Sequence, residues 1–267
     1  MNRVMALLGK ELADLRRNPG VFVPAVITGF LTVLIPLFVA VAVPYFSGER
    51  LSDSRDFHIA VEMYRNQPAS RALDPEGAIQ AWIFQQFLLM LILAPIAGSM
   101  SVAAYTIIGE KQARTLEPLL ATPITTIELL AGKILGSLLP AVGIAIACFF
   151  FYLACVVIFA RPGVAWTLVA PRSLAIVFIL GPVASLVALQ LAVFVSSRVN
   201  DARSAQQLGA LIILPIVGLL IAQLTGNVML TARGILLISG ALIAVNAALM
   251  RIGTALFDRE SILTRWK

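Results

Sequence analysis

Residues 134–160 read ILGSLLPAVGIAIACFFFYLACVVIFA and contain no Asp, Glu, Lys or Arg. A helix needs about 20 predominantly apolar residues to cross the hydrocarbon core of a bilayer, so this run is long enough to span it. Five other charge-free runs occur, at residues 18–48, 77–109, 173–197, 204–232 and 234–250. The last run is the shortest, but Arg233 and Arg251 at its ends can extend to the two interfaces. The sequence therefore predicts six transmembrane helices.

The composition of the whole chain agrees with a polytopic membrane protein. Of its 267 residues, 60% are hydrophobic and 13% are charged, and the mean hydropathy is +0.94. Soluble domains carry about 25% charged residues. The same apolar composition excludes an intrinsically disordered chain, and the runs are too long for the strands of a membrane barrel. We expect an all-α polytopic membrane protein in which residues 1–267 form a single transmembrane domain.

Lys and Arg residues are divided unequally between the two sides that six spans define. Thirteen lie on the side that holds both termini, and seven lie on the other side. Because Lys and Arg are enriched in cytoplasmic loops, both termini are predicted to be cytoplasmic and residues 47–76 to form an external loop. This topology accounts for the net charge of +6. No concentrated basic face is visible, so a nucleic-acid partner is not expected.

Residues 1–18 are predicted to form an interfacial elbow helix that lies along the cytoplasmic leaflet. Apolar side chains fall on one stripe, at Val4, Met5, Leu8, Leu12 and Leu15. Charged side chains cover the opposite side, at Arg3, Lys10, Glu11, Asp14 and Arg17. Asn18, Pro19 and Gly20 end this helix.

Motifs of catalysis and metal binding are missing from the sequence. It contains no Gly-x-x-x-x-Gly-Lys-[Ser/Thr] loop for ATP and no Gly-x-Ser. The single histidine, His58, lies near Asp53 and Asp56 in the predicted external loop, where solvated side chains are the simplest interpretation. Cys148 and Cys155 are seven residues apart on one helix, about 10.5 Å, which is too far for a disulfide. We expect no catalytic residue, no metal site and no cofactor in this chain.

The polar residues inside the six predicted helices are neutral. Proton-coupled transporters usually place ionisable side chains within the membrane, and in this sequence the helix interiors have none. Neutral amides and hydroxyls can line a pathway or hydrogen-bond between helices. The candidates for a pathway are Gln85, Gln86, Ser99, Ser101, Gln190, Gln223 and Asn246. If the protein moves a substrate uphill, another subunit is expected to supply the energy.

Residues 109–133, GEKQARTLEPLLATPITTIELLAGK, separate the second and third predicted spans. Thr115 can cap a short helix that has Glu117 and Pro118 in its first turn, and Pro123 stops this helix. Its apolar face consists of Leu116, Leu119 and Leu120. Thr125 and Glu128 then form a capping box for the next helix, which fixes where that helix begins. Two interpretations remain open: the short helix inserts into a protein pocket, or it lies on lipid as an elbow.

This segment resembles the cytoplasmic loop of ABC-2-type permeases, the membrane subunits of ATP-driven exporters, and is most similar to the NatB branch. The shared elements occur in order as Glu110-Lys111, Thr115-Leu116-Glu117, Leu119-Leu120-Ala121-Thr122-Pro123 and Gly132-Lys133. Weaker similarities lie at both ends of the chain, in Lys10-Glu11-Leu12, Arg17-Asn18-Pro19 and Phe257-Asp258-Arg259-Glu260. The resemblance thus extends over the whole chain.

The resemblance implies an elbow helix, six spanning helices and a cytoplasmic coupling helix between the second and third spans. It also implies two copies of a cytoplasmic ABC ATPase subunit that bind ATP and Mg, and a second permease copy or a paralogue. The residues expected to contact the ATPase are Glu110, Arg114, Thr115, Leu116, Glu117, Pro118, Leu119, Leu120, Thr122 and Pro123. The implied function is ATP-driven export of an ion, lipid, drug or peptide across a bacterial or archaeal cytoplasmic membrane.

Two other classes of function remain open from the sequence. The chain could be a non-transporting scaffold, or an ABC-2-like component of an envelope assembly, maturation or motility machine. Co-purification with an ATPase separates an ABC subunit from an unrelated scaffold, and ATPase stimulation by a substrate then favours transport. A secondary transporter would instead show gradient-driven flux in liposomes from this chain alone.

The charge asymmetry predicts that residue 58 is outside the cell. A His58→Cys variant should therefore react with a membrane-impermeant thiol reagent added externally. The parent chain, whose two cysteines lie in the third predicted span, is the control. Labelling from the cytoplasmic side alone would contradict the topology.

Overall fold

The computed structural model describes residues 2–53, 73–112, 126–198, 213–225 and 230–256, and all regular secondary structure in this part of the chain is helical. In chain order the main elements are α1 (Asn2–Arg17), η1 (Pro19–Phe22), α2 (Val23–Leu37), η2 (Phe38–Ala42), α3 (Val43–Ser47), η3 (Leu51–Asp53), α5 (Pro75–Phe87), η6 (Leu88–Ile92), α6 (Leu93–Gln112), α8 (Thr126–Phe159), α9 (Val164–Leu168), α10 (Pro171–Ala175), η7 (Ile176–Leu180), α11 (Gly181–Arg198), α13 (Ile213–Leu224) and α14 (Ala232–Leu256).

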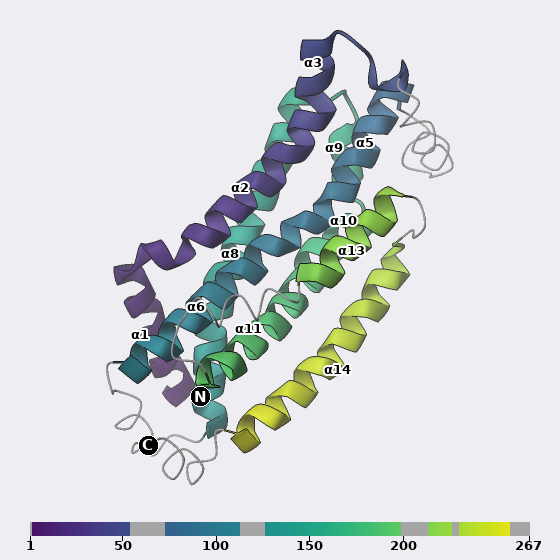
Figure 1. Cartoon of the computed structure of the whole chain (residues 1–267). Coiled ribbons are helices and arrows are strands. Elements are labelled where there is room, and N and C mark those ends of the chain that lie inside the picture. The colour runs from purple at the N-terminus through teal and green to yellow at the C-terminus, as the bar shows by residue number, and fades with distance from the viewer. Residues whose placement is uncertain (1, 54–72, 113–125, 199–212, 226–229, 257–267) are drawn as a thin grey trace.

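These elements form an elongated bundle whose long axes run roughly side by side (Figure 1). One end of the bundle holds α1 and the last turn of α14, and we call it the proximal end. The opposite, distal end holds α3, α9 and the beginning of α5 (Figure 1). The first and last described helices therefore share one end, which agrees with an even number of crossings.

Five helical stretches are long and apolar enough to cross a membrane. They are Pro19–Ser47, Pro75–Ala103, Ala131–Phe159, Pro171–Phe194 and Ala232–Ile252, and they coincide with five of the six charge-free runs. Short 3₁₀ or π segments interrupt three of them, at η2, η6 and η7. Five predicted spans are thus present, and the chain is multi-pass.

The remaining predicted span, the fifth in chain order at about residues 207–223, is described only in part. The described portion is α13, a 12-residue apolar helix that is too short to span a bilayer alone. Residues 199–212 lie outside the described part of the chain. This fifth span, and with it the total of six, therefore stays a prediction.

The N-terminal helix packs on the bundle through a face that shares only Leu15 with the predicted apolar stripe. In the structure α1 packs against the beginning of α8 and buries Leu7, Glu11 and Leu15, which are spaced four residues apart. Met5 and Leu12, which belong to the predicted stripe, are exposed. One face of α1 therefore contacts α8, and the predicted contact of the exposed stripe with the cytoplasmic leaflet stays a prediction.

The segment at residues 161–172, which separates two of the charge-free runs, contains short helices. It includes α9, whose Val164, Thr167 and Leu168 are buried, and the beginning of α10. Gly163 precedes α9 with φ of +89°, a backbone conformation that glycine adopts without strain. The chain thereby turns sharply and packs α9 against α5.

Small residues bring α2, α6 and α8 into close contact. A Cβ atom at Gly98 of α6 would lie 2.8 Å from the Cβ of Ala25 on α2 and 3.2 Å from the Cβ of Ala141 on α8. Ala25 and Ala141 are fully buried. Helices in lipid associate through such close approach of their backbones, because the surrounding hydrocarbon is as apolar as their side chains. Gly98 therefore marks a point where all three helices approach one another closely.

This packing predicts opposite effects for two glycine-to-alanine substitutions. Gly98→Ala should lower stability by about 1–3 kcal/mol, because the added methyl overpacks the contact with Ala25. A methyl added by Gly143→Ala, in α8, would meet no described atom within 4 Å, so that change should be neutral or stabilising by up to about 1 kcal/mol. Thermal unfolding of both variants in one detergent checks this. An equal shift for both would show that close packing at residue 98 is unimportant.

Candidate functional site

The predicted coupling segment lies between two helices that the structure places side by side at the proximal end. Helix α6 ends at Gln112, and α8 begins at Thr126. Of the predicted contact residues, Glu110 belongs to α6, where the structure describes its backbone only. Arg114 through Pro123 lie outside the described residues. The coupling helix therefore stays a prediction, although the two helices that flank it are both in place.

A buried ion pair joins α1 to α8 directly after this segment. Lys133 Nζ donates a hydrogen bond to Glu11 Oε1 at 3.2 Å, and the two side chains are only 8% and 4% exposed. Removing both charges from water is costly, and their attraction together with the hydrogen bond offsets that cost. Loss of either partner alone would leave a buried charge with much poorer compensation.

Two glycines on α8 allow α1 to come this close. A Cβ atom at Gly132 would lie 2.8 Å from the Cβ of Leu7, and one at Gly136 would lie 2.7 Å from the Cβ of Glu11. The two glycines are four residues apart and lie on one face of α8, the small-x-x-x-small spacing of close helix contacts. Because these two positions carry no side chain, α1 lies close enough to α8 for the carboxylate of Glu11 to reach Lys133.

Sequence reasoning missed this ion pair. The sequence pattern places Glu11 on the polar face of an interfacial helix, and Lys133 enters it only as one of the cytoplasmic cations. The Gly132-x-x-x-Gly136 spacing is the available signal, because it marks a surface that another helix can approach closely. The partner helix cannot be identified from it, since Glu11 and Lys133 are 122 residues apart.

Glutamine side chains hold the distal end together. Gln80 Nε2 donates to the carbonyl oxygen of Ala40 at 3.1 Å, and Gln80 Oε1 accepts from the backbone N–H of Arg161 at 2.9 Å. Gln85 Nε2 donates to the carbonyl oxygen of Thr167 on α9 at 2.9 Å. Both glutamines are buried. They connect α5 to η2, to α9 and to the end of the third span.

Arg172 adds a charged group to this polar cluster. Its guanidinium donates to Gln85 Oε1 at 3.3 Å and to Gln86 Oε1 at 3.5 Å. Arg172 is one of the seven cations on the predicted external side, and the structure half-buries it at the beginning of α10. Two of the predicted pathway residues, Gln85 and Gln86, therefore contact the same arginine.

The other predicted pathway residues are buried at separate positions along the bundle. Ser99 Oγ lies 3.1 Å from the carbonyl oxygen of Ile96 and 3.4 Å from that of Ser185 on α11. Ser101 Oγ donates to the carbonyl oxygen of Ala97 at 2.8 Å. These two hydroxyls thus bond to backbone oxygens within the bundle.

Three amides are only partly satisfied by the described residues. Asn246 Nδ2 donates to the carbonyl oxygen of Val183 at 3.2 Å, but its Oδ1 is buried without a hydrogen-bond partner among them. Gln190 Oε1 and both amide atoms of Gln223 are in the same state. Such buried amides are rare, so these three are the better candidates for further polar contacts. A role in lining a pathway stays a prediction for all seven residues.

Within the described residues no group of three or more His, Cys, Asp or Glu side chains could hold a metal ion. Cys148 and Cys155 are both free thiols.

A comparison with protein families assigns the chain. Residues 5–257 match the model described as ABC-2 family transporter protein. This chain belongs to the ABC-2 transporter family. No curated protein and no solved structure matches it. The chain is thus the multi-pass membrane component of an ABC-2 family transporter, and permeases of this family generally pair with an ABC ATPase and are typically non-catalytic themselves.

The α1–α8 ion pair predicts that replacing one partner lowers stability more than replacing both partners. Lys133→Met leaves the Glu11 carboxylate buried without its cation and should cost about 3–5 kcal/mol. The double variant Glu11→Gln with Lys133→Met removes both charges and should recover most of that loss. Arg16→Met, an exposed position on α1, is the control. Thermal unfolding in detergent checks all three, and equal losses in the single and double variants would contradict the coupling.

Proposed function

We propose that this chain is the permease subunit of an ATP-driven exporter and that a separate ABC ATPase subunit hydrolyses the ATP. The family match supports the membrane role, and the missing ATP-binding loop motif in the sequence favours hydrolysis on a partner. The assembly would contain two ATPase copies and either two copies of this chain or one copy and a paralogue. Both termini and the ATPase subunits would lie in the cytoplasm of a bacterium or archaeon.

The observation that carries the proposed docking is the arrangement of the proximal end. Helices α6 and α8 pack side by side and bracket residues 113–125, whose sequence predicts a short helix with an apolar face. The Glu11–Lys133 ion pair then ties α8 to α1 seven residues after α8 begins, about two helical turns. A force applied to the segment before α8 would therefore reach two helices at once.

The chemistry of the predicted segment indicates how the ATPase would hold it. Leu116, Leu119 and Leu120 would fill a cleft on the ATPase, and Arg114 and Glu117 would make charged contacts at its rim. Interfaces of this kind concentrate their binding energy in a few buried anchors, each costing roughly 1–3 kcal/mol when truncated. The loop motif resembles that of the NatB branch, and the cargo remains within the classes of ion, lipid, drug or peptide.

Substitution of one anchor tests this proposal. Leu119→Asp would place a charge in the cleft and should release the ATPase or uncouple hydrolysis from transport, while membrane insertion is kept. Leu119→Met, which nearly conserves volume, and His58→Ala in the predicted external loop are the controls and should behave like the parent chain. The measurements are pull-down of the ATPase and its activity in nanodiscs.

Two outcomes of that experiment would contradict the proposal. If Leu119→Asp keeps parental docking and coupled hydrolysis, the segment is a lipid-facing elbow and the coupling claim fails. The mass of the active complex also reports its stoichiometry. An active complex with a single permease copy would exclude the proposed permease dimer.

A further inference from the structure

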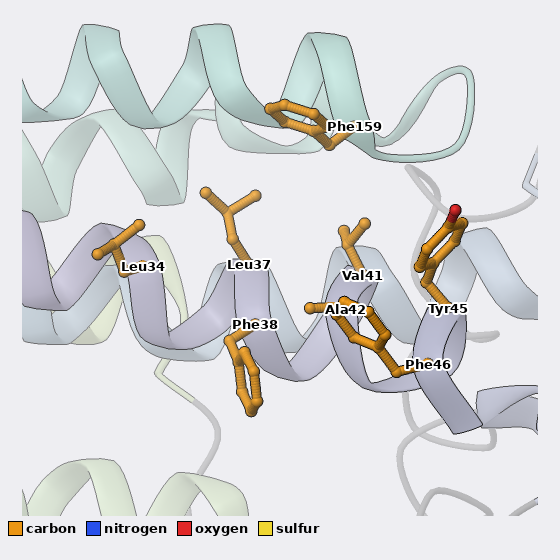
Figure 2. A pocket seen from close by; sticks show the side chains of 8 residues that line it. All are labelled: Leu34, Leu37, Phe38, Val41, Ala42, Tyr45, Phe46 and Phe159. Carbon is orange, nitrogen blue, oxygen red and sulfur yellow. The ribbon is translucent and has the colours of Figure 1, made fainter. Parts of the chain in front are cut away.

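An apolar groove runs along the distal half of the first span. Side chains from α2, η2 and α3 form one wall, and Phe159 at the end of α8 faces them (Figure 2). Leu37 and Val41 point toward the side on which Phe159 lies (Figure 2). The cavity has a volume of about 600 Å³, and its lining is almost entirely apolar. The groove runs along a span, Pro19–Ser47, so we expect it to face the hydrocarbon of the membrane.

The course of the first span explains why the groove begins where it does. At Gly29 and Phe30, α2 lies tightly against α8: a Cβ at Gly29 would be 2.6 Å from Cys148 Sγ, and the ring centroids of Phe30 and Phe151 are 5.9 Å apart. Pro36 then removes a helical hydrogen bond, and the π-turn η2 follows directly. Such features bend helices, and the cavity opens along this altered stretch.

The dimensions of the groove match a single lipid chain. Leu34 and Tyr45, two of its lining residues, are eleven residues apart, about 17 Å along a helix. One leaflet of hydrocarbon is about 15 Å thick, half of the roughly 30 Å core. A helix about 10 Å wide and 17 Å long would occupy roughly 1,300 Å³, more than the whole space between the atoms of the groove, about 1,070 Å³. An extended acyl chain fits the groove, whereas a helix of a second copy would lie only across its mouth.

The distal end of the groove carries the chemistry of a headgroup site. Tyr45 and Phe46 are more than 80% exposed there, as expected for aromatic side chains at a membrane interface. Each wall then continues into an exposed arginine: Arg50 follows α3, and Arg161 lies two residues after Phe159. Two arginines that follow the two walls of the groove in sequence supply positive charge of the kind that binds the phosphate of a lipid. Glu49 is also exposed, next to Arg50, and would suit the ammonium of a zwitterionic headgroup.

We propose that this groove binds one acyl chain of a phospholipid whose phosphate is held by Arg50 and Arg161. The polar segment of this chain that follows, residues 54–72, is an unsuitable occupant because it carries many charged residues. The inference does not depend on the ATPase or on the exported substrate. It assigns a lipid site to the distal end, away from the proposed docking segment at the proximal end.

Photolabelling of the purified full chain in nanodiscs tests the acyl-chain site. The probe is phosphatidylcholine with a diazirine in one acyl chain, and labelled positions are mapped by peptide mass spectrometry. Labelling of residues 34–46 should exceed by several-fold that of the exposed, lipid-facing Leu237 region of α14. Val41→Trp should fill the groove and remove the excess, while labelling at α14 stays unchanged. Ile27→Trp, on the same helix but outside the groove, should have no effect.

A second probe tests the phosphate contact. Diacylglycerol with the same photoreactive chain lacks the phosphate and should label the groove several-fold less than phosphatidylcholine does. Arg50→Gln combined with Arg161→Gln should abolish this difference. Equal labelling by both probes in the parent chain would overturn the assignment of a phospholipid.

Other outcomes decide between lipid and protein. Labelling of residues 34–46 no stronger than that of α14 would overturn the acyl-chain site. Efficient Phe46→Cys crosslinks between two chains, together with an unlabelled groove, would show that a second copy covers it. Parental labelling of α14 and parental elution in size-exclusion chromatography verify that each variant is folded.

Discussion

Close contact between helices through small side chains is the constraint on which the bundle depends. Lipid hydrocarbon competes equally for apolar side chains, so helices in a membrane associate through backbone approach and hydrogen bonds. Gly98 provides the approach where α2, α6 and α8 meet, and Gly132 and Gly136 repeat it where α1 meets α8. Beyond Pro36 the apolar groove opens between the first span and the end of α8. The first span thus contributes its beginning to the tightly packed core and its end to the groove.

Hydrogen bonds from polar side chains are concentrated at the distal end. Gln80 and Gln85 bond to backbone groups of other segments, which ties the short helix α9 to the second span. An amide group that already hydrogen-bonds within the bundle cannot bind a substrate unless the helices move. Gln190, Gln223 and Asn246 differ, because each retains a buried amide atom without a partner among the described residues. The demand for further polar contacts is therefore strongest at these three residues.

The five spans were predictable because their signal is local: a helix long enough to cross a bilayer must avoid charge over its whole length. Features that depend on distant partners were not. The sequence places Glu11 on a polar face, and only the packing of α8 against α1 brings Lys133 to it. Helix α9 has five residues, which is too short for a periodic pattern of apolar residues to predict it. The resemblance to the family and the proposed ATPase contact could be predicted because both depend on a local motif, residues 109–133. The half-buried position of Arg172 required the fold, since Gln85 and Gln86 are far from it in sequence.

The arrangement at the proximal end determines how a displacement would travel through the chain. Helix α8 is continuous for 34 residues from Thr126, so a push on the segment before it moves the whole helix. The ion pair makes α1 follow, and α1 leads through η1 directly into α2. Helix α2 also contacts α8 through Gly29, which closes a ring of contacts among α1, α2 and α8. Three helices bound in this way should shift as one body, and α6, which packs against α2 and α8 at Gly98, should shift with them.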